Sequence, residues 1–279
     1  MFTIEFFEDG NGRSPVEEWM DSDLTDVELA ALLAGLEHVL SHRGIHVCGT
    51  EWGKQLGEGL FEFRIRHTAA EIERMFKDAS LGRPEGKREK VLLRVFCHAY
   101  GTKIVLLLNG YDKAGDPSEK RQQREIMLAR RRLAEFKERQ ARERKRQRRG
   151  GGRHPGVGLT AVCLKVHTGI SKEFDMARTL DDYLQRSKRA NSPEVSAARA
   201  VFDQAYGVAR QVIELREKHH LTQVELAEKA GLPQAQISRI ERGAVSPTTA
   251  TLAKIAEALG ADLRLVERPQ PRARRSAAG

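Results

Sequence analysis

The clearest pattern of apolar and polar positions lies near the C-terminal end, where two short amphipathic segments flank a glycine. Thr222 and Glu225 have the spacing of a capping box, which predicts that a helix begins close to Val224. This helix should end at Gly231, because glycine readily adopts the left-handed backbone conformation. Its small apolar stripe predicts packing against neighbouring helices.

A second short helix is predicted over Gln234–Arg242, with Ile237 and Ile240 directed inward. Pro233 stands where a side-chain N-cap is usual, so this helix should have a weak cap. Two short helices joined by a tight turn form a helix-turn-helix pattern. The second helix turns small and amide-bearing side chains outward, and these suit base edges in a major groove. The candidate DNA-binding residues, including the glutamine that starts the first helix, are Gln223, Gln234, Ala235, Gln236, Ser238 and Arg239.

Residues 207–267 resemble the DNA-binding domains of the Cro/repressor (XRE) family. The expected flanking elements agree, with helices at Val208–His219 and Thr248–Leu259 and a strand at Ala261–Glu267. The resemblance implies that Arg216 pairs with Glu241 and that Gln223 contacts a phosphate. It also implies a homodimer on a two-fold operator, with half-sites about one helical turn apart. A helical bundle without a DNA ligand is the alternative interpretation of the pattern.

Residues 1–140, the front half, combine strand-like alternation with amphipathic helices, which predicts a compact α+β domain. Capping boxes start two helices, from Pro15 and Asp26, and the second should end near Gly44. The expected strands are Phe2–Glu8, Leu60–Arg66, Val91–Tyr100 and Lys103–Tyr111. Also expected are a helical turn at 69–77, a mobile connection at 81–90, and a long helix from Ser118 with Ile126, Ala129, Leu133 and Phe136 inward. The predicted fold class is α+β followed by an all-α helix-turn-helix domain.

Four segments of the front half carry a second resemblance. They are GLFEFRIRH (59–67), VLLRVFCHAYG (91–101), KIVLLLNGYDK (103–113) and KRQQREIMLARRR (120–132). Together they resemble the RelE/HigB-type toxins of the phage-derived branch. The resemblance implies a RelE-like fold, a small antiparallel sheet with packed helices, and a metal-independent endonuclease that cuts mRNA on the ribosome. The implied chemistry is attack of an RNA 2′-OH on the adjacent phosphate, which needs proton transfer and positive charge.

The resemblance also implies a catalytic set on the sheet and after its last strand. The candidate catalytic residues are Arg64, Arg66, Arg94, Tyr111 and Lys113. Arg64 and Arg94 would clamp the phosphate, because a planar guanidinium binds pairs of oxygen atoms. Lys113 would act as an acid or a cation, and Tyr111 would stack on a base or share in proton transfer.

Strand periodicity places Arg66 on the same side of the sheet as Arg64, and it places His67 on the opposite side. The alternative interpretation of each strand arginine is the solvated face of a half-open sheet. The sequence shows no carboxylate–histidine cluster for a metal, so neither a metal nor another cofactor is expected.

A segment of changing composition joins the two halves. The predicted divisions are 1–140, a basic tail and flexible linker at 141–175, a helical segment at 176–206, the helix-turn-helix domain at 207–267 and a disordered tail at 268–279. The run Arg139–Arg149 is either a solvated helix end or an anchor for RNA. Met176 opens a stretch typical of a protein's own N-terminus, which indicates two formerly separate reading frames. An ordinary linker is the alternative.

The amino-acid composition limits the possible binding partners and cellular compartments. The 279 residues suffice for two domains, and the net charge of +9 favours nucleic acid. Cys48, Cys97 and Cys163 are widely spaced and odd in number, which fits a reducing cytoplasm and no structural zinc site. The sequence shows no membrane-length apolar run and no signal peptide, so a cytoplasmic protein is expected.

The order of the two halves is that of HigB-type toxin–antitoxin loci. The resemblance therefore implies a fusion whose C-terminal half masks the nuclease by an intramolecular contact and represses its own operator. A flexible tether would hold the two halves at roughly millimolar effective concentration. The alternative is an XRE-family transcription regulator whose non-catalytic front half dimerises or senses a ligand. A third interpretation is a joined product of two neighbouring genes.

Overall fold

A computed structural model describes residues 1–79, 90–150 and 178–264, and its centre is a five-stranded sheet. The strands are β1 (Thr3–Phe6), β2 (Gly53–Gly57), β3 (Leu60–His67), β4 (Val91–Tyr100) and β5 (Ile104–Asp112). Their order in the sheet is β1-β5-β4-β3-β2. β1 runs parallel to β5, and the other neighbours are antiparallel. The α+β class predicted for the front half is therefore confirmed.

One face of the sheet is covered by the helices that follow β1. These are α1 (Pro15–Ser22), α2 (Asp26–Gly35), the π-helical turn η1 (Leu36–Leu40), α3 (Ser41–Arg43) and the 3₁₀ segment η2 (Gly44–Gly49). The predicted capping box is present, because Thr25 accepts a bond from the Glu28 amide and Glu28 accepts one from the Thr25 amide at 2.8 Å. Leu29, Leu32 and Leu36 are fully buried, as the apolar pattern predicts.

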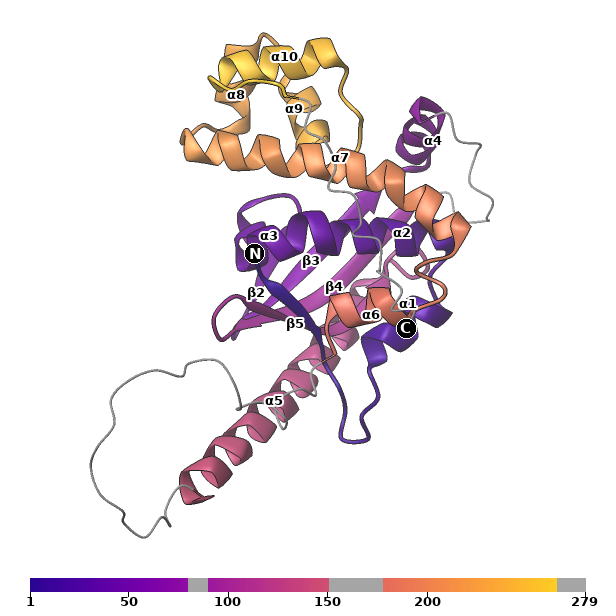
Figure 1. The fold of residues 1–279 in the computed structure, drawn as a ribbon, viewed down its shortest axis with the longest axis vertical. Coiled ribbons are helices and arrows are strands. Elements are labelled where there is room, and N and C mark those ends of the chain that lie inside the picture. Colours follow the sequence, from indigo (N-terminus) through magenta and orange to yellow (C-terminus); the bar gives the residue numbers. More distant parts are fainter. Residues whose placement is uncertain (80–89, 151–177, 265–279) are drawn as a thin grey trace, which may run out of the picture.

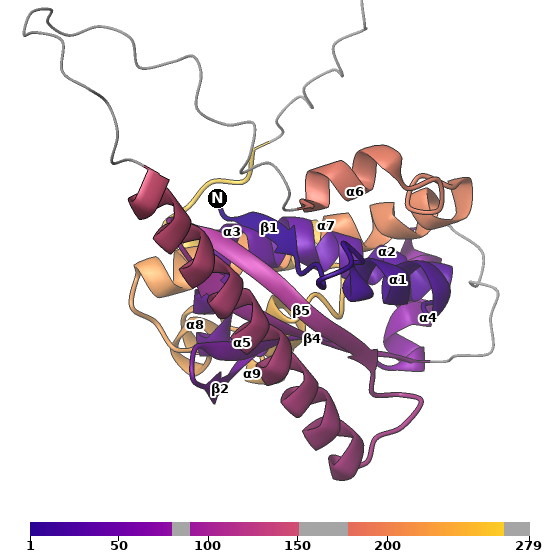
Figure 2. The ribbon, with the colours of Figure 1, turned by 90° about the horizontal axis from the view of Figure 1, so that it is seen from below.

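The long helix α5 (Glu119–Gly150) crosses the opposite face of the sheet (Figure 2). Its predicted inner residues Ile126, Ala129 and Leu133 pack into one cluster with Phe96 and Tyr111. The helix continues to Gly150, beyond the end of this apolar stripe, and the described side chains of residues 141–146 are exposed. The sheet is therefore a layer between α5 and the helices of the other face.

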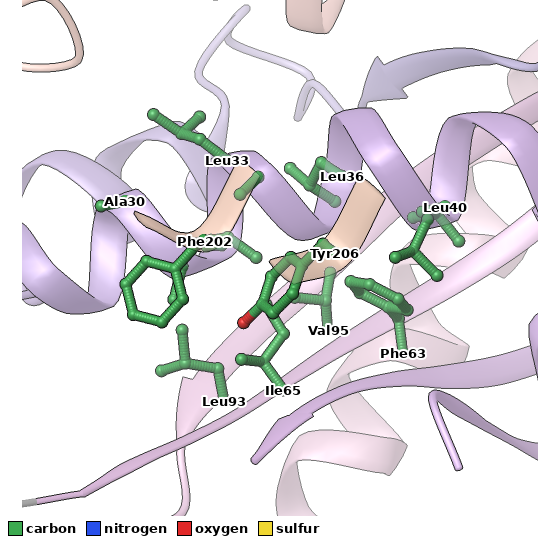
Figure 3. Packing of buried hydrophobic residues seen from close by; sticks show 14 of the residues in the cluster. Ala30, Leu33, Leu36, Leu40, Phe63, Ile65, Leu93, Val95, Phe202 and Tyr206 are labelled. Carbon is green, nitrogen blue, oxygen red and sulfur yellow. The ribbon is translucent and has the colours of Figure 1, made fainter. Parts of the chain in front are cut away.

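The helix α7 (Pro193–Lys218) joins the two halves, and the short α6 (Leu180–Arg186) precedes it. Figure 1 shows α7 between α2 and the C-terminal helices. Its first part belongs to the core of the sheet, where Phe202 and Tyr206 lie near Leu33, Ile65 and Leu93 (Figure 3). The predicted division at residue 207 separates a helical segment from the helix Val208–His219, whereas the structure has one continuous helix across this position.

The remaining helices form a small bundle on the second part of α7. They are α8 (Gln223–Ala230), α9 (Gln234–Glu241) and α10 (Thr249–Ala258). Leu226, Ile237 and Ile255 pack there against Val212 of α7. One helix thus contributes to two cores, and residues 178–264, the C-terminal half, are built onto the front half.

Several local predictions need correction. The sequence analysis did not predict β2, an edge strand whose residues lack apolar alternation. The expected helical turn at 69–77 is the full helix α4 (Ala69–Asp78), which has a capping box at Thr68. Residues 261–264 are not a strand. The expectations for 81–89, 151–175 and 268–279 fall outside the described residues. Among the described residues, no helix is both long and apolar enough to span a membrane.

Candidate functional site

The turn between α8 and α9 has the geometry that its sequence predicts. The Thr222 side chain accepts a hydrogen bond from the amide of Glu225, and Glu225 accepts one from the Thr222 amide at 2.7 Å. Gly231 adopts the left-handed conformation with φ of 60°, which lets the chain reverse within a few residues. Pro233 occupies the N-cap position of α9 without a side-chain hydrogen bond, as expected.

A buried ion pair fixes α9 against the helices behind it. Glu241 is 3% exposed, and its carboxylate lies 2.5 Å from Nε and 3.0 Å from Nη2 of Arg216 on α7. The Gln223 amide nitrogen donates to the same carboxylate at 3.0 Å. Gln234 in turn donates to the side-chain oxygen of Gln223 at 3.0 Å. The predicted Arg216–Glu241 pair is present, and Gln223 links it to the start of α9.

Most predicted DNA-binding side chains lie on the solvent side of α9. Gln234, Ala235 and Arg239 are exposed. Gln236 and Ser238 are half-buried, and the Ser238 hydroxyl donates to Glu51 of the front half at 2.6 Å. The structure therefore gathers five of the six predicted residues on α9, with Gln223 on α8, and the front half already binds one of them, Ser238.

The front half contacts the C-terminal end of α9 through further side chains. The indole nitrogen of Trp52 donates to the backbone oxygen of Glu241 at 2.8 Å. Arg242, directly after α9, donates to Glu71 of α4 at 2.7 Å. The two halves are therefore in contact, and this contact reaches the helix-turn-helix itself.

Three of the five candidate catalytic residues form a row across the sheet. Arg64 of β3 lies opposite Arg94 of β4, and Arg94 lies opposite Tyr111 of β5. Residues directly opposite each other share a face, so this arginine row faces α5. The buried Glu62 lies between the two guanidinium groups, 2.8 Å from Arg64 and 3.1 Å from Arg94. The row thus already contains an anion.

The surroundings of the arginine row change its acid–base properties. Burial lowers the pKa of the Arg94 guanidinium, and the neighbouring Glu62 carboxylate partly opposes that shift. Burial is also the main cause that raises the pKa of Tyr111 to about 12, with Glu62 as the next cause. Tyr111 is 2% exposed and stacks on Phe96 at a centroid distance of 6.0 Å. In this conformation it is neither placed to stack on a base nor an effective acid at neutral pH.

The other two candidates lie apart from the row. The Lys113 amine donates to Gln122 of α5 at 2.9 Å. Arg66 has the strand parity of Arg64, and its guanidinium pairs with Glu51 at 3.0 Å. His67 lies on the opposite face, as predicted, where it bonds the Tyr206 hydroxyl at 2.6 Å. The C-terminal half therefore packs on the face that lacks the arginine row.

One group of side chains has the composition of a metal site. Glu37 and His38 of η1 and Asp203 of α7 each offer an atom within 4.8 Å of the others. The sequence analysis did not find this group, because α7 brings Asp203 from far along the chain. Arg199 forms ion pairs with both carboxylates, so the group also acts as a charge cluster between the halves.

The glutamates at these contacts were missed by the sequence analysis. Glu62 could have been found, because it has the strand parity of Arg64 and must share its face. Glu51 and Glu71 give no such signal. Their partners Ser238 and Arg242 lie in the distant C-terminal half.

Comparisons with known proteins find similarities for part of the C-terminal half. Residues 212–266 match the helix-turn-helix family model, so this region is similar to the helix-turn-helix domains of that family. The chain is also similar to the immunity repressor protein of Bacillus phage phi105, with 42% identity over 53 residues. The aligned part is 19% of this chain and 37% of the relative, so the chain covers little more than a third of that protein's length. No solved structure matches. These likenesses support a DNA-binding regulator, and the RelE/HigB resemblance stays a prediction.

Proposed function

We propose that this chain is a transcription regulator that reads operator DNA with α9, and that its front half is a non-catalytic partner of this reader. The observation that carries the proposal is the helix-turn-helix of α8 and α9, which the family model matches. Gln234, Ala235 and Arg239 are exposed on α9. Amide and guanidinium groups read adenine and guanine edges in the major groove. The similarity to a phage repressor supports the same function.

The pairing of the arginine row supports a non-catalytic front half. Arg64 and Arg94 both lie against Glu62, which is fully buried. A phosphate could bind these guanidinium groups only by displacing a carboxylate that has no access to water. Removing the partner of a buried charge is strongly unfavourable. The front half then acts as a module for dimerisation or ligand sensing.

A regulator of this type is expected to act as a homodimer. One α9 reads only a few base pairs, whereas two copies related by a two-fold axis read two half-sites about one helical turn apart. The expected operator is therefore a short inverted repeat. Exposed basic side chains outside α9, such as that of Lys229 on α8, would add phosphate contacts that do not depend on sequence.

The proposal is tested by selecting duplexes from a random pool with the full chain and measuring binding to the enriched sequence. Arg239→Ala and Gln234→Ala should each weaken binding roughly tenfold or more, because each removes a base contact. Arg131→Ala is the matched control, since it removes an exposed arginine from α5. No enriched sequence, or equal losses in all three variants, would contradict the proposal.

A second candidate function is the toxin–antitoxin fusion, and the arginine row is the observation that favours it. Arg64, Arg94 and Tyr111 lie side by side on three strands. Lys113 follows Tyr111 closely, and its amide donates to Leu92 beside the same row at 2.8 Å. If Glu62 moved away, the two arginines could bind a scissile phosphate, and Lys113 could protonate the leaving oxygen. mRNA on the ribosome would be the substrate.

Restraint by the C-terminal half would have to be indirect in this second candidate. α7 packs on the face opposite the arginine row, so it does not cover Arg64 or Arg94. Cleavage within residues 151–177 would leave α7 packed on α2, and we therefore expect the cut alone to leave the halves together. The test is expression of residues 1–149. Arrested growth that Lys113→Ala abolishes and that residues 176–279 suppress would support a toxin, whereas normal growth would exclude it.

A further inference from the structure

The outward side of α9 forms a continuous strip of side chains. Residues along a helix are spaced at 3.6 per turn, so side chains three or four positions apart share a face. Ile237 and Ile240 define the buried side of α9. The opposite side, here called the outer strip, consists of Gln234, Ala235, Ser238, Arg239 and, just after the helix, Arg242. A duplex that received α9 in its major groove would face this strip.

Two members of the outer strip already bind carboxylates of the front half. The Ser238 hydroxyl donates to Oε1 of Glu51 at 2.6 Å. The Arg242 guanidinium donates to Oε1 of Glu71 at 2.7 Å, and its Nε lies 4.0 Å from Glu51. Both contacts lie at the C-terminal end of α9, while Gln234 at its start is exposed. The front half thus binds side chains at one end of the outer strip and leaves Gln234, at the other end, exposed to solvent.

The two carboxylates are held in place by the front half itself. Glu51 also accepts a bond from Arg66 of β3 at 3.0 Å. Glu71 accepts a bond from the amide of Thr68 at 2.8 Å, as part of the capping box of α4. Each glutamate is therefore positioned by a contact that does not involve α9. Such preorganised acceptors bind a donor at little additional entropic cost.

We propose that Glu51 and Glu71 make the front half an internal competitor of DNA for the outer strip. This inference rests on the proposed DNA-binding function. A phosphate and a carboxylate are both anionic acceptors of hydrogen bonds from guanidinium and hydroxyl groups. Ser238 and Arg242 can satisfy DNA fully only after they release the glutamates. A duplex also brings its phosphates close to the two carboxylates, and repulsion between these like charges opposes docking.

The shared core explains why this competitor stays close to α9. Tyr206 of α7 is buried beneath the helix-turn-helix and contacts Trp52 at a centroid distance of 4.8 Å. Trp52 in turn holds the backbone of Glu241 at 2.8 Å. The helix-turn-helix cannot move away as a unit without exposing these rings to water. Release of Ser238 and Arg242 is therefore a local movement of side chains, and it recurs at every binding event.

The experiment measures binding of the full chain to two fluorescein-labelled duplexes, the enriched sequence described above and a scrambled duplex of equal length. Glu51→Gln and Glu71→Gln remove the negative charges, and glutamine can still complete the capping box of α4. Glu73→Gln is the matched control, because it removes an exposed carboxylate from the same helix. We expect the double variant to bind the enriched duplex roughly tenfold more tightly, and each single variant to gain less. Glu73→Gln should bind within about twofold of the parent.

Each outcome is decisive. Tighter binding by the Glu51 and Glu71 variants alone supports internal competition. Unchanged binding overturns it, and so does an equal gain in Glu73→Gln, which would indicate a general effect of net charge. Weaker binding also overturns it, because the glutamates would then contribute to a composite DNA surface. If neither the parent nor any variant binds either duplex, the proposed DNA-binding function fails together with the inference. Binding by every form with equal affinity leaves that function intact and rejects only the competitor.

Discussion

The two faces of the central sheet are built from different chemistry. The face under α2 and α7 is almost entirely apolar, and its buried polar contacts include the His67–Tyr206 hydrogen bond of 2.6 Å and the Trp52–Glu241 hydrogen bond of 2.8 Å. The face under α5 contains the buried charges of Glu62 and Arg94. Apolar burial is non-directional and holds large surfaces together. Buried charges need specific partners, and they often mark functional or specificity-determining positions.

The two faces therefore have different roles. The apolar face holds the C-terminal half, whereas the other face holds the buried charged side chains. α7 attaches the C-terminal half by completing the apolar face, as Figure 3 shows for Phe202 and Tyr206. The arginine row lies on the other face, under α5. Changes on one face should therefore affect how the halves hold together, and changes on the other should affect the buried ion pairs. Three substitutions test this separation.

The largest effect is expected at the apolar face. Tyr206→Ala removes a fully buried ring that contacts Phe202, Trp52 and His67, and it should lower the free energy of unfolding by about 4 kcal/mol. Urea denaturation followed by circular dichroism measures the change. Tyr206→Phe is the control, because it removes only the hydroxyl and should cost about 1 kcal/mol. A loss below about 1 kcal/mol in the alanine variant would show that α7 is not part of the core.

An intermediate effect is expected at the polar face. Arg94→Met leaves the buried Glu62 with Arg64 as its remaining charged partner, and it should destabilise the fold by about 2–3 kcal/mol. Adding Glu62→Leu removes the uncompensated charge and should recover most of this loss. Denaturation of the two single variants and the double variant forms a double-mutant cycle. Strictly additive losses would show that the two side chains are not coupled.

The smallest effect concerns pH and returns to the apolar face. Burial, with the charge of Arg242 as a smaller cause, lowers the pKa of His67 to about 3. The unfolded chain, with an ordinary histidine pKa of about 6.5, takes up the proton first as pH falls. This contribution to stability is therefore complete above pH 6.5 and declines toward pH 3, by about 2 kcal/mol at pH 5.

His67→Gln tests this pH dependence, because glutamine does not titrate and can still bond the Tyr206 hydroxyl. Denaturation between about pH 7 and pH 5 should show a shallower loss of stability in this variant than in the parent. His46→Gln, at the exposed position in η2, is the control and should keep the parent slope. Identical slopes in all three proteins would mean that His67 is not buried in the neutral form.

Local structure was predictable wherever a short-range signal exists. Neighbouring residues alone specify the capping boxes at Thr25 and Thr222 and the weak cap at Pro233. The structure has all three. β2 was missed because its edge strand depends on pairing with β3 rather than on its own pattern. The continuity of α7 from Pro193 to Lys218 was also missed, because it depends on packing against two separate cores rather than on a local signal.

The site was predictable in part for the same reason. The residues of α9 follow from helical periodicity, and the alignment of Arg64 with Arg94 agrees with the strand pattern. The pairing of Ser238 with Glu51 joins positions 187 residues apart, and no local pattern specifies it. Contacts of this kind arise from the shared core, which places the two halves against each other.

Native-state hydrogen exchange is the most direct test of this shared core. The amides of Val201–Tyr206 in α7 should exchange as slowly as those of Phe63–Ile65 in β3, and they should accelerate together as urea is added, because both segments open only with the whole core. The account would be contradicted if the amides in this part of α7 exchanged far faster than those in β3. Their exchange would then not depend on unfolding of the front half. It would show two tethered halves in place of one continuous core.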